Sequence, residues 1–162
     1  TYGGIPMIYA GDEIATLNDY SYEQNEDHIN DNRWVNRPMQ NWNVVAKIKT
    51  EKDSPSTIVY NGFKKMIRLR KEHTVFADTN NIKIHGCPNE HIFVFQRSHE
   101  DESVWVLSNF NEVTETINIG WLLSIGILTG KNSIDLLTGK SIEFIQNELA
   151  LMPYEQLWIK NI

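Results

Sequence analysis

The chain has 162 residues, 41% of them hydrophobic, and a formal net charge of −6 at pH 7. This composition is sufficient for a folded core, and the acidic balance argues against a nucleic-acid-binding protein. No apolar run approaches the roughly 20 residues that a membrane helix needs, so we expect no membrane partner. Cys87 is the only cysteine. An internal disulfide is therefore excluded, a reducing compartment is favoured, and we expect a cytoplasmic protein.

The first predicted element is a buried strand at residues 5–9. These positions are apolar consecutively rather than alternately, which is typical of a strand that is buried on both faces. Gly11 ends it, and Asp12 and Glu13 follow at its carboxyl end, where α/β folds bind ligands. One strand cannot bury both faces alone, and the chain does not begin with methionine. We therefore expect it to be the C-terminal part of a longer protein.

A polar segment with little periodicity follows at residues 16–43, rich in Asn, Asp, Glu and Tyr. A loop of this length inside a compact domain is usually functional. The end of the segment predicts a short helix at residues 42–49.

The clearest helix is predicted at residues 54–73. Ser54 can cap it, and Pro55 occupies the first helical position, where its missing N–H costs nothing. Gly62 lies inside the pattern and costs up to about 1 kcal/mol relative to Ala, so we expect a close packing contact there. The apolar residues recur at spacings of three and four: Val59, Phe63, Met66 and Ile67.

Beyond residue 81 the pattern changes to short strands separated by turns, which is typical of an antiparallel sheet or sandwich. Trp105 and Trp158 lie in two of these strands, and we interpret them as core residues rather than sugar-binding platforms. The helix ends before this region, which predicts two parts, residues 1–78 and 79–162. The predicted strands are 82–84, 91–95, 103–107, 116–119, 133–137, 141–144 and 155–159.

Several of these residues carry a family resemblance. The stretch from Gly4 to Glu13, with the pattern G-x-P, apolar residues and G-x-E, resembles the eighth barrel strand of the α-amylase superfamily of glycoside hydrolases and transglycosylases. The runs TLNDY at residues 16–20, DNRW at 31–34 and NRP at 36–38 are similar to the amylosucrase branch. The resemblance implies an α+β chain: the final βα unit of a (β/α)8 barrel, residues 1–78, followed by an antiparallel β-sandwich domain, residues 79–162.

The resemblance also implies the chemistry of the longer protein. Such an enzyme takes the glucosyl unit of sucrose, releases fructose, and passes glucose to an α-glucan or to water without a cofactor. It works through a carboxylate nucleophile and a carboxylic acid/base about 5 Å apart. In the family these groups lie on strands that precede this segment, so we expect no catalytic residue here and no activity from this chain alone.

Arg33 is the first candidate for a substrate-binding residue. By resemblance it matches an arginine that pairs with an aspartate at the closed end of the sucrose pocket, a role that suits a planar guanidinium. The alternative is that Arg33 only neutralises the acidic run around it. Asp19 and Arg37, together with Tyr20, are candidates for the acceptor route, or are loop residues that hold their neighbours. Asn36 stands where the pattern usually has histidine, which weakens any inference about acceptor specificity.

Other sites are disfavoured by spacing. Asp12 and Glu13 are adjacent, so on a strand they would point to opposite faces and could not flank one glycosidic bond; a structural role is favoured. The oxygen-rich run at residues 27–32 lacks the glycine and distal glutamate of a calcium loop. The five histidines show no zinc-ligand spacing with one another or with Cys87, so no metal site is predicted.

Two alternatives remain open. The C-terminal sheet could be a free-standing carbohydrate-binding or interaction module, which should display a linear array of exposed aromatic rings. The chain could also come from another α-glucosidase of the superfamily that uses a different donor. If the barrel is missing, the helix face at Val59, Phe63 and Ile67 has lost its partners, and we expect it to pack on the sheet, to self-associate or to remain an apolar patch.

Overall fold

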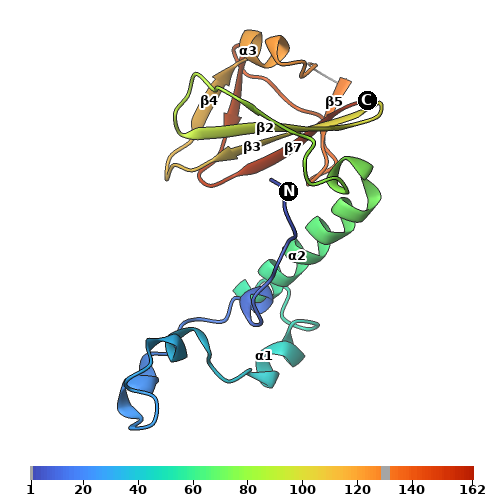
Figure 1. The fold of residues 1–162 in the computed structure, drawn as a ribbon. Coiled ribbons are helices and arrows are strands. Elements are labelled where there is room, and N and C mark those ends of the chain that lie inside the picture. The colour runs from blue at the N-terminus through green and yellow to red at the C-terminus, as the bar shows by residue number, and fades with distance from the viewer. Residues whose placement is uncertain (1, 129–131) are drawn as a thin grey trace. The chain divides into compact units, whose positions relative to one another are not determined.

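The computed structural model describes residues 2–128 and 132–162, which form two compact units (Figure 1). One unit is Met7–Ile67, and the other combines residues 2–6 with Arg68–Ile162. The division falls inside helix α2 (Pro55–Glu72). No helix in the described parts of the chain is long and apolar enough to cross a membrane.

The strand predicted at residues 5–9 is not formed. No described segment pairs with these residues, and the side chains of Ile5 and Met7 are 85% and 90% exposed. A strand exists only through hydrogen bonds to a neighbouring strand, and no such neighbour is present. The residues that follow form the 3₁₀ turn η1 (Asp12–Ile14). The strand-based prediction that Asp12 and Glu13 point to opposite faces therefore does not apply.

The polar segment folds into short turns that are capped by its own side chains. They are η2 (Tyr20–Gln24), η3 (Asn32–Asn36) and helix α1 (Trp42–Lys47). The Asn41 side chain accepts hydrogen bonds from the first N–H groups of α1. The Asp19 N–H donates to the Val35 carbonyl at 2.9 Å, which joins η2 to η3. The predicted short helix at residues 42–49 is confirmed, two residues shorter than expected.

Helix α2 confirms the prediction for residues 54–73. Ser54 Oγ accepts the Thr57 N–H at 3.3 Å, as expected of an N-cap. The close contact expected at Gly62 is wrong, because a Cβ added there meets nothing within 4 Å among the described residues. Ile67, on the predicted apolar face, is 42% exposed.

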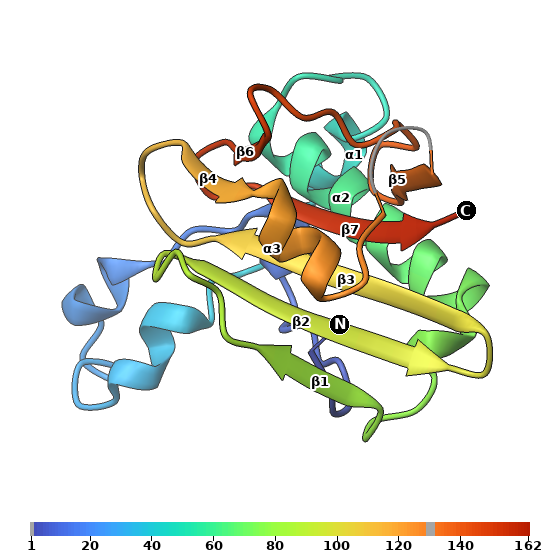
Figure 2. The ribbon, with the colours of Figure 1, turned by 90° about the horizontal axis from the view of Figure 1, so that it is seen from above.

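The C-terminal unit is built on an antiparallel five-stranded sheet with the order β1-β2-β3-β7-β5 (Figure 2). A second layer consists of the paired strands β4 and β6 together with helix α3 (Ile119–Ser124). The prediction of an antiparallel sheet domain is confirmed. The strands are β1 (Ile82–His85), β2 (Ile92–His99), β3 (Glu102–Asn109), β4 (Glu115–Asn118), β5 (Ser133–Asp135), β6 (Glu148–Leu151) and β7 (Gln156–Asn161).

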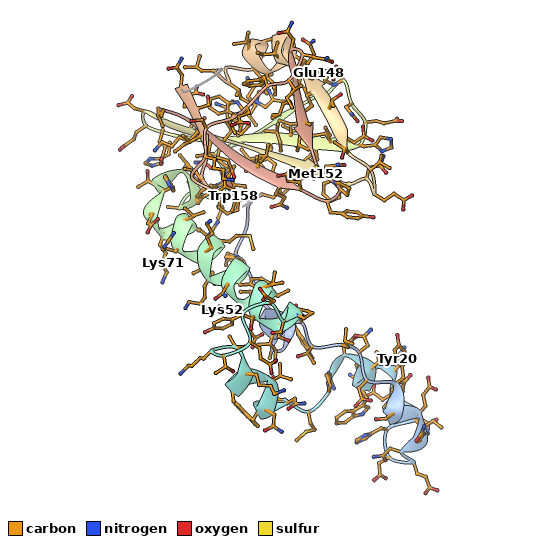
Figure 3. The ribbon with its side chains drawn as sticks, turned by 180° about the vertical axis from the view of Figure 1, so that it is seen from behind. Tyr20, Lys52, Lys71, Glu148, Met152 and Trp158 are labelled. Carbon is orange, nitrogen blue, oxygen red and sulfur yellow. The ribbon has the colours of Figure 1, made fainter. Side chains whose placement is uncertain are left out.

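The alternation of side chains along the strands divides the core into two layers. Trp105 lies opposite Ile159 and faces α3 and the small sheet, where it belongs to the main hydrophobic cluster. Trp158 faces the other side and packs on Phe76 of η4 (Thr74–Phe76), with ring centroids 5.2 Å apart (Figure 3). Both tryptophans are buried, which confirms their interpretation as core residues.

Three features of this unit differ from the prediction. Helix α3 and strand β6 were not predicted, and the strand expected at residues 141–144 is reduced to an isolated bridge between Ile134 and Ser141. Helix α3 has six residues and one capping side chain, Asn118, so it is too short to show a helical period.

Candidate functional site

A hollow of about 450 Å³ opens in the unit Met7–Ile67, between the turn after residue 9 and the end of η3. Backbone and polar side chains from three separate stretches converge on it, as is typical of small-molecule sites. The polar side chains that line it include those of Asp12, Thr16, Asn18, Arg33, Asn36 and Arg37. Two of the three predicted substrate-binding residues, Arg33 and Arg37, therefore lie at the same hollow.

Arg33 is held by an aspartate two residues before it. Its Nε donates to Asp31 Oδ1 and its Nη2 donates to Asp31 Oδ2, each at 2.7 Å. The hydrogen bonds from Arg33 lower the pKa of Asp31 to about 2, and those same bonds raise the pKa of Arg33. Both groups therefore stay charged throughout the physiological range. Arg33 therefore lines the hollow and also neutralises a neighbouring carboxylate, and its contact with a sugar stays a prediction.

Arg37 is supported by an aromatic stack. Its guanidinium lies over the Trp34 ring, 5.9 Å from the centroid, and the His28 ring stacks against Trp34 at 3.8 Å. Cation–π contacts of this kind orient a guanidinium without a carboxylate partner. In the described parts of the chain, no carboxylate lies within ion-pair distance of Arg37.

Asp19 does not line the hollow. Its Oδ1 accepts the Ser21 N–H at 2.9 Å as the cap of η2, and the hydrogen bonds from Ser21 lower its pKa. The adjacent Tyr20 is exposed on the outside of the polar segment (Figure 3). The structure thus gives Asp19 a capping role, and the contact of Asp19 with an acceptor stays a prediction.

Glu13 has a structural role. Its Oε2 accepts the Gly11 N–H at 2.8 Å and closes the turn that forms one wall of the hollow. Gly11 adopts φ of +106°, which favours glycine, and a Cβ there would lie 3.0 Å from Thr16 Oγ1. Asp12 lines the hollow and is exposed.

Sequence reasoning missed two residues that organise this site, Asp31 and Trp34. The available signal was the spacing Asp-x-Arg, because an N-cap aspartate faces the second residue of its turn. The contacts of Trp34 with His28 and Arg37 depend on the conformation of the loop, which a sequence of low periodicity does not predict.

A second hollow in the same unit, of about 470 Å³, is largely apolar. One side is lined by Trp42 and Val45 of α1 and by Ile48, the residue that follows this helix. Ile14 and Tyr60 line another side. Glu13, Gln40 and Lys49 also line this hollow, but it is more apolar than the first hollow, so it is the weaker candidate for a sugar site.

The C-terminal unit does not display the ring array expected of a carbohydrate-binding module. Among its described residues, the strongly exposed aromatic side chains are Tyr2, Phe110 and Tyr154. Tyr2 packs on Phe93 and Phe95 at 5.8 and 5.5 Å between centroids, so its ring is engaged within the unit.

Comparison with known proteins shows what the sheet domain is similar to. Residues 83–159 match the family model described as the cyclo-malto-dextrinase C-terminal domain. The sheet domain is therefore similar to C-terminal domains of this type.

Two curated proteins match nearly the whole chain. Glucosylglycerate phosphorylase of Escherichia coli (strain K12) is 24% identical over 99% of this chain and 26% of its own length. Neopullulanase 2 of Thermoactinomyces vulgaris is 27% identical over 99% of this chain and 24% of its own length. The chain thus spans about a quarter of these relatives.

Solved structures share the fold. A variant of AmyP in complex with maltotriose aligns with a TM-score of 0.55 and 16% identity, over 69% of this chain and 22% of that one. An α-amylase from H. orenii aligns with a TM-score of 0.50 and 19% identity, over 73% of this chain and 22% of that one. At these identities the likeness concerns the fold alone.

Proposed function

We propose that this chain is the C-terminal part of a retaining, α-glucoside-active enzyme of the α-amylase superfamily. It contributes one wall of the sugar pocket and none of the catalytic carboxylates. The observation that carries the proposal is the hollow at Arg33 and Arg37. The end of the G-x-P…G-x-E segment lines this hollow, and the sheet domain of the chain is similar to the cyclo-malto-dextrinase C-terminal domain.

The proposal includes the architecture of the full-length protein. Residues 5–9 are its last barrel strand, unpaired here because the neighbouring strands lie outside the chain. Residues 1–78 complete a (β/α)8 barrel, and residues 79–162 form the closing β domain. The exposure of Ile5 and Met7 supports this, because both side chains would be buried between barrel and helices.

As the donor we propose sucrose, as in the amylosucrase branch. The support is the run from Asp31 through Pro38 and the placement of Arg33 at the hollow. A guanidinium at the end of a pocket closes it to long chains and offers paired donors to one sugar ring. Reaction through a glycosyl-enzyme would then deliver glucose to an α-glucan or to water.

Phosphorolysis is the second candidate. It is favoured by the match of 24% identity over nearly the whole chain to a glucosylglycerate phosphorylase. In that case phosphate takes the place of water or glucan as the acceptor, and the product is a glucose phosphate.

The test uses the full-length protein with sucrose, alone and with added phosphate or maltodextrin. Release of fructose supports the sucrose proposal, and formation of glucose phosphate that requires phosphate supports the second candidate. Hydrolysis of maltodextrin with no action on sucrose would refute the sucrose donor but keep the family activity. No action on any α-glucoside would refute the proposed function, as would sucrose turnover by the 162-residue chain alone.

A further inference from the structure

We propose that the C-terminal unit carries an accessory binding site for α-glucan chains, with the exposed rings of Phe110 and Tyr154 as its platform. The site belongs to a different unit from the hollow at Arg33 and Arg37. The choice of an α-glucan as the ligand rests on the proposed function, whereas the platform rests on the geometry of two loops. Two rings are fewer than the linear array of a free-standing module, so the site supplements the pocket of the same protein.

The two rings stand on neighbouring segments at one end of the five-stranded sheet. Strands β3 and β7 are paired antiparallel. At their ends the Asn109 N–H donates to the Glu155 carbonyl at 3.0 Å, and the Tyr154 N–H donates to the Asn111 carbonyl at 3.3 Å. Phe110 therefore lies opposite Tyr154, at a separation that is typical of cross-strand neighbours.

A buried amide holds the two segments together. The Asn109 side chain is 3% exposed, and its Nδ2 donates to the carbonyls of Val113 and Met152 at 2.9 Å and of Leu151 at 3.2 Å. Its Oδ1 accepts the Asn111 N–H at 2.8 Å. The loop after β3 and the turn after β6 are thus fixed to each other. A ligand that binds there need not order the backbone, which lowers the entropic cost of binding.

Tyr154 occupies a turn position that favours glycine. The Glu155 N–H donates to the Met152 carbonyl at 3.0 Å, Pro153 is the second residue of this turn, and Tyr154, the third, has φ of +57°. These are the features of a type II turn, in which the third residue is normally Gly or Asn. A bulky residue there is strained. The Tyr154 side chain is 68% exposed, so packing within the unit does not offset the strain, and display of the ring accounts for it.

The surroundings of the rings suit a neutral ligand with many hydroxyl groups. Within the part of the chain that the structure describes, neither ring contacts another aromatic ring. The exposed side chains of Val113 and Met152 extend the apolar surface. The carboxylates of Glu112 and Glu155 border it, and they accept hydrogen bonds from hydroxyls and repel anionic ligands.

A glucose ring has this combination of groups. Its two faces carry C–H groups, which can lie on the partially negative face of an aromatic side chain, and its edge carries hydroxyls that can donate to carboxylates. A nucleic acid or an anionic membrane would instead meet repulsion from the acidic border. The chemistry of the platform therefore favours a neutral glucan.

The experiment measures binding of amylose to the full-length protein by affinity electrophoresis, together with activity on a short α-glucoside and melting temperature. The variants are Phe110→Ala, Tyr154→Gly and Tyr154→Phe. The control is Ile145→Ala, which removes a side chain that is 73% exposed in the same unit. We expect Phe110→Ala and Tyr154→Gly each to raise the dissociation constant for amylose about fivefold, as loss of one aromatic contact predicts. Tyr154→Phe keeps the ring and should bind normally, as should Ile145→Ala, and activity on the short α-glucoside should not change.

Tyr154→Gly also separates display from a structural role. Glycine removes the strain at positive φ, so the melting temperature should stay the same or rise while amylose binding weakens. Unchanged amylose binding in Phe110→Ala and Tyr154→Gly would overturn the inference. A lower melting temperature with unchanged binding would also overturn it, because the rings would then pack on another part of the protein. If Ile145→Ala weakened binding equally, the platform would be refuted. Inactivity of the full-length protein on every α-glucoside would refute the proposed function, and the amylose measurement would still decide the platform.

Discussion

Replacing Asp135 by alanine should unfold the C-terminal unit at moderate temperature. The side chain is 2% exposed and accepts four hydrogen bonds. Oδ1 accepts from Leu137 N at 3.1 Å and Trp158 N at 2.9 Å, and Oδ2 accepts from Thr138 N at 2.9 Å and Thr138 Oγ1 at 2.7 Å. The carboxylate thus joins the turn after β5 to the middle of β7.

The loss of stability follows from the hydrogen-bond donors that the substitution leaves without an acceptor. A hydrogen bond to a charged group contributes roughly 1.5–3 kcal/mol, and a buried donor without a partner costs roughly 1–3 kcal/mol. The Trp158 N–H is buried, whereas the N–H groups of Leu137 and Thr138 can reach water. We therefore expect Asp135→Ala to lower the free energy of unfolding by about 4 kcal/mol. In a unit of this size that corresponds to a fall in melting temperature of about 15–30 °C.

Asp135→Asn should be milder. The amide can keep its oxygen toward Leu137 and Trp158 and turn its nitrogen toward Thr138, whose hydroxyl can reverse and accept. The bonds that remain are no longer made to a charged group and the Thr138 N–H turns to water, so we expect a loss of about 2 kcal/mol.

The assay is urea and thermal denaturation of the 162-residue chain, followed by circular dichroism and tryptophan fluorescence. The control is Asp101→Ala, which removes an exposed carboxylate from the β2–β3 turn of the same unit. The reasoning would be refuted if the free energy of unfolding of Asp135→Ala lay within about 1 kcal/mol of that of the unmodified chain, or if Asp135→Ala were no more destabilised than Asp101→Ala.

Three further predictions concern both units. Burial opposes ionisation of Glu102, but hydrogen bonds from Lys160 and His73 outweigh it and hold the pKa of Glu102 below its usual range. The contribution of Glu102 to the free energy of unfolding should therefore be complete above about pH 5 and be lost as the pH falls through its lowered pKa. In Glu102→Gln the urea midpoint should no longer show this fall at acid pH. Gly126→Ala should cost about 2 kcal/mol in urea unfolding, because φ is +93° and the new Cβ would lie 3.3 Å from the Trp105 ring; no measurable loss would contradict the strain. The isolated chain should self-associate or bind a hydrophobic dye through its exposed apolar segment and helix face, and a dye-free monomer in size-exclusion chromatography would contradict this.

The parts of the fold that sequence predicts are those with complete local signals. Helix α2 has a cap, a proline at its first position and a full helical period, and its start at Pro55 is confirmed. Strands β2, β3 and β7 are rich in β-branched and aromatic residues and are bounded by turns. Helix α3 is too short to carry a helical period, so tertiary packing decides it. Strand β6 was missed although its four residues alternate between exposed and buried.

Residues 5–9 show the opposite case, a strong local signal that the chain alone cannot satisfy. Their apolar sequence predicts a strand, but pairing requires neighbours, and the described residues supply none. The vacant surroundings of Gly62 have the same cause under the proposed architecture: the segment that would approach it lies outside the chain.

The candidate site was predictable in part. Arg33 and Arg37 were identified through resemblance, and both line the hollow. Their supports, Asp31 and Trp34, depend on how the polar segment turns back on itself, and such turns carry no period. Asp19 has the same residue type and loop setting as Asp31 but caps a different turn, away from the hollow. Residue type and loop setting therefore could not show which of the two aspartates lies near the hollow.

The short turn η4 bears on how such proteins can be divided. Val75 and Phe76 are fully buried, Phe76 packs on Trp158, and the neighbouring His73 bonds Glu102 at 2.6 Å. A cut after residue 78, where the sequence predicts the boundary between two parts, would remove these buried side chains from the sheet and leave apolar surface exposed on both fragments. Cloning boundaries for the β domain should therefore begin upstream of Leu69, and grafts of this domain onto other enzymes should carry the last turn of the helix with them.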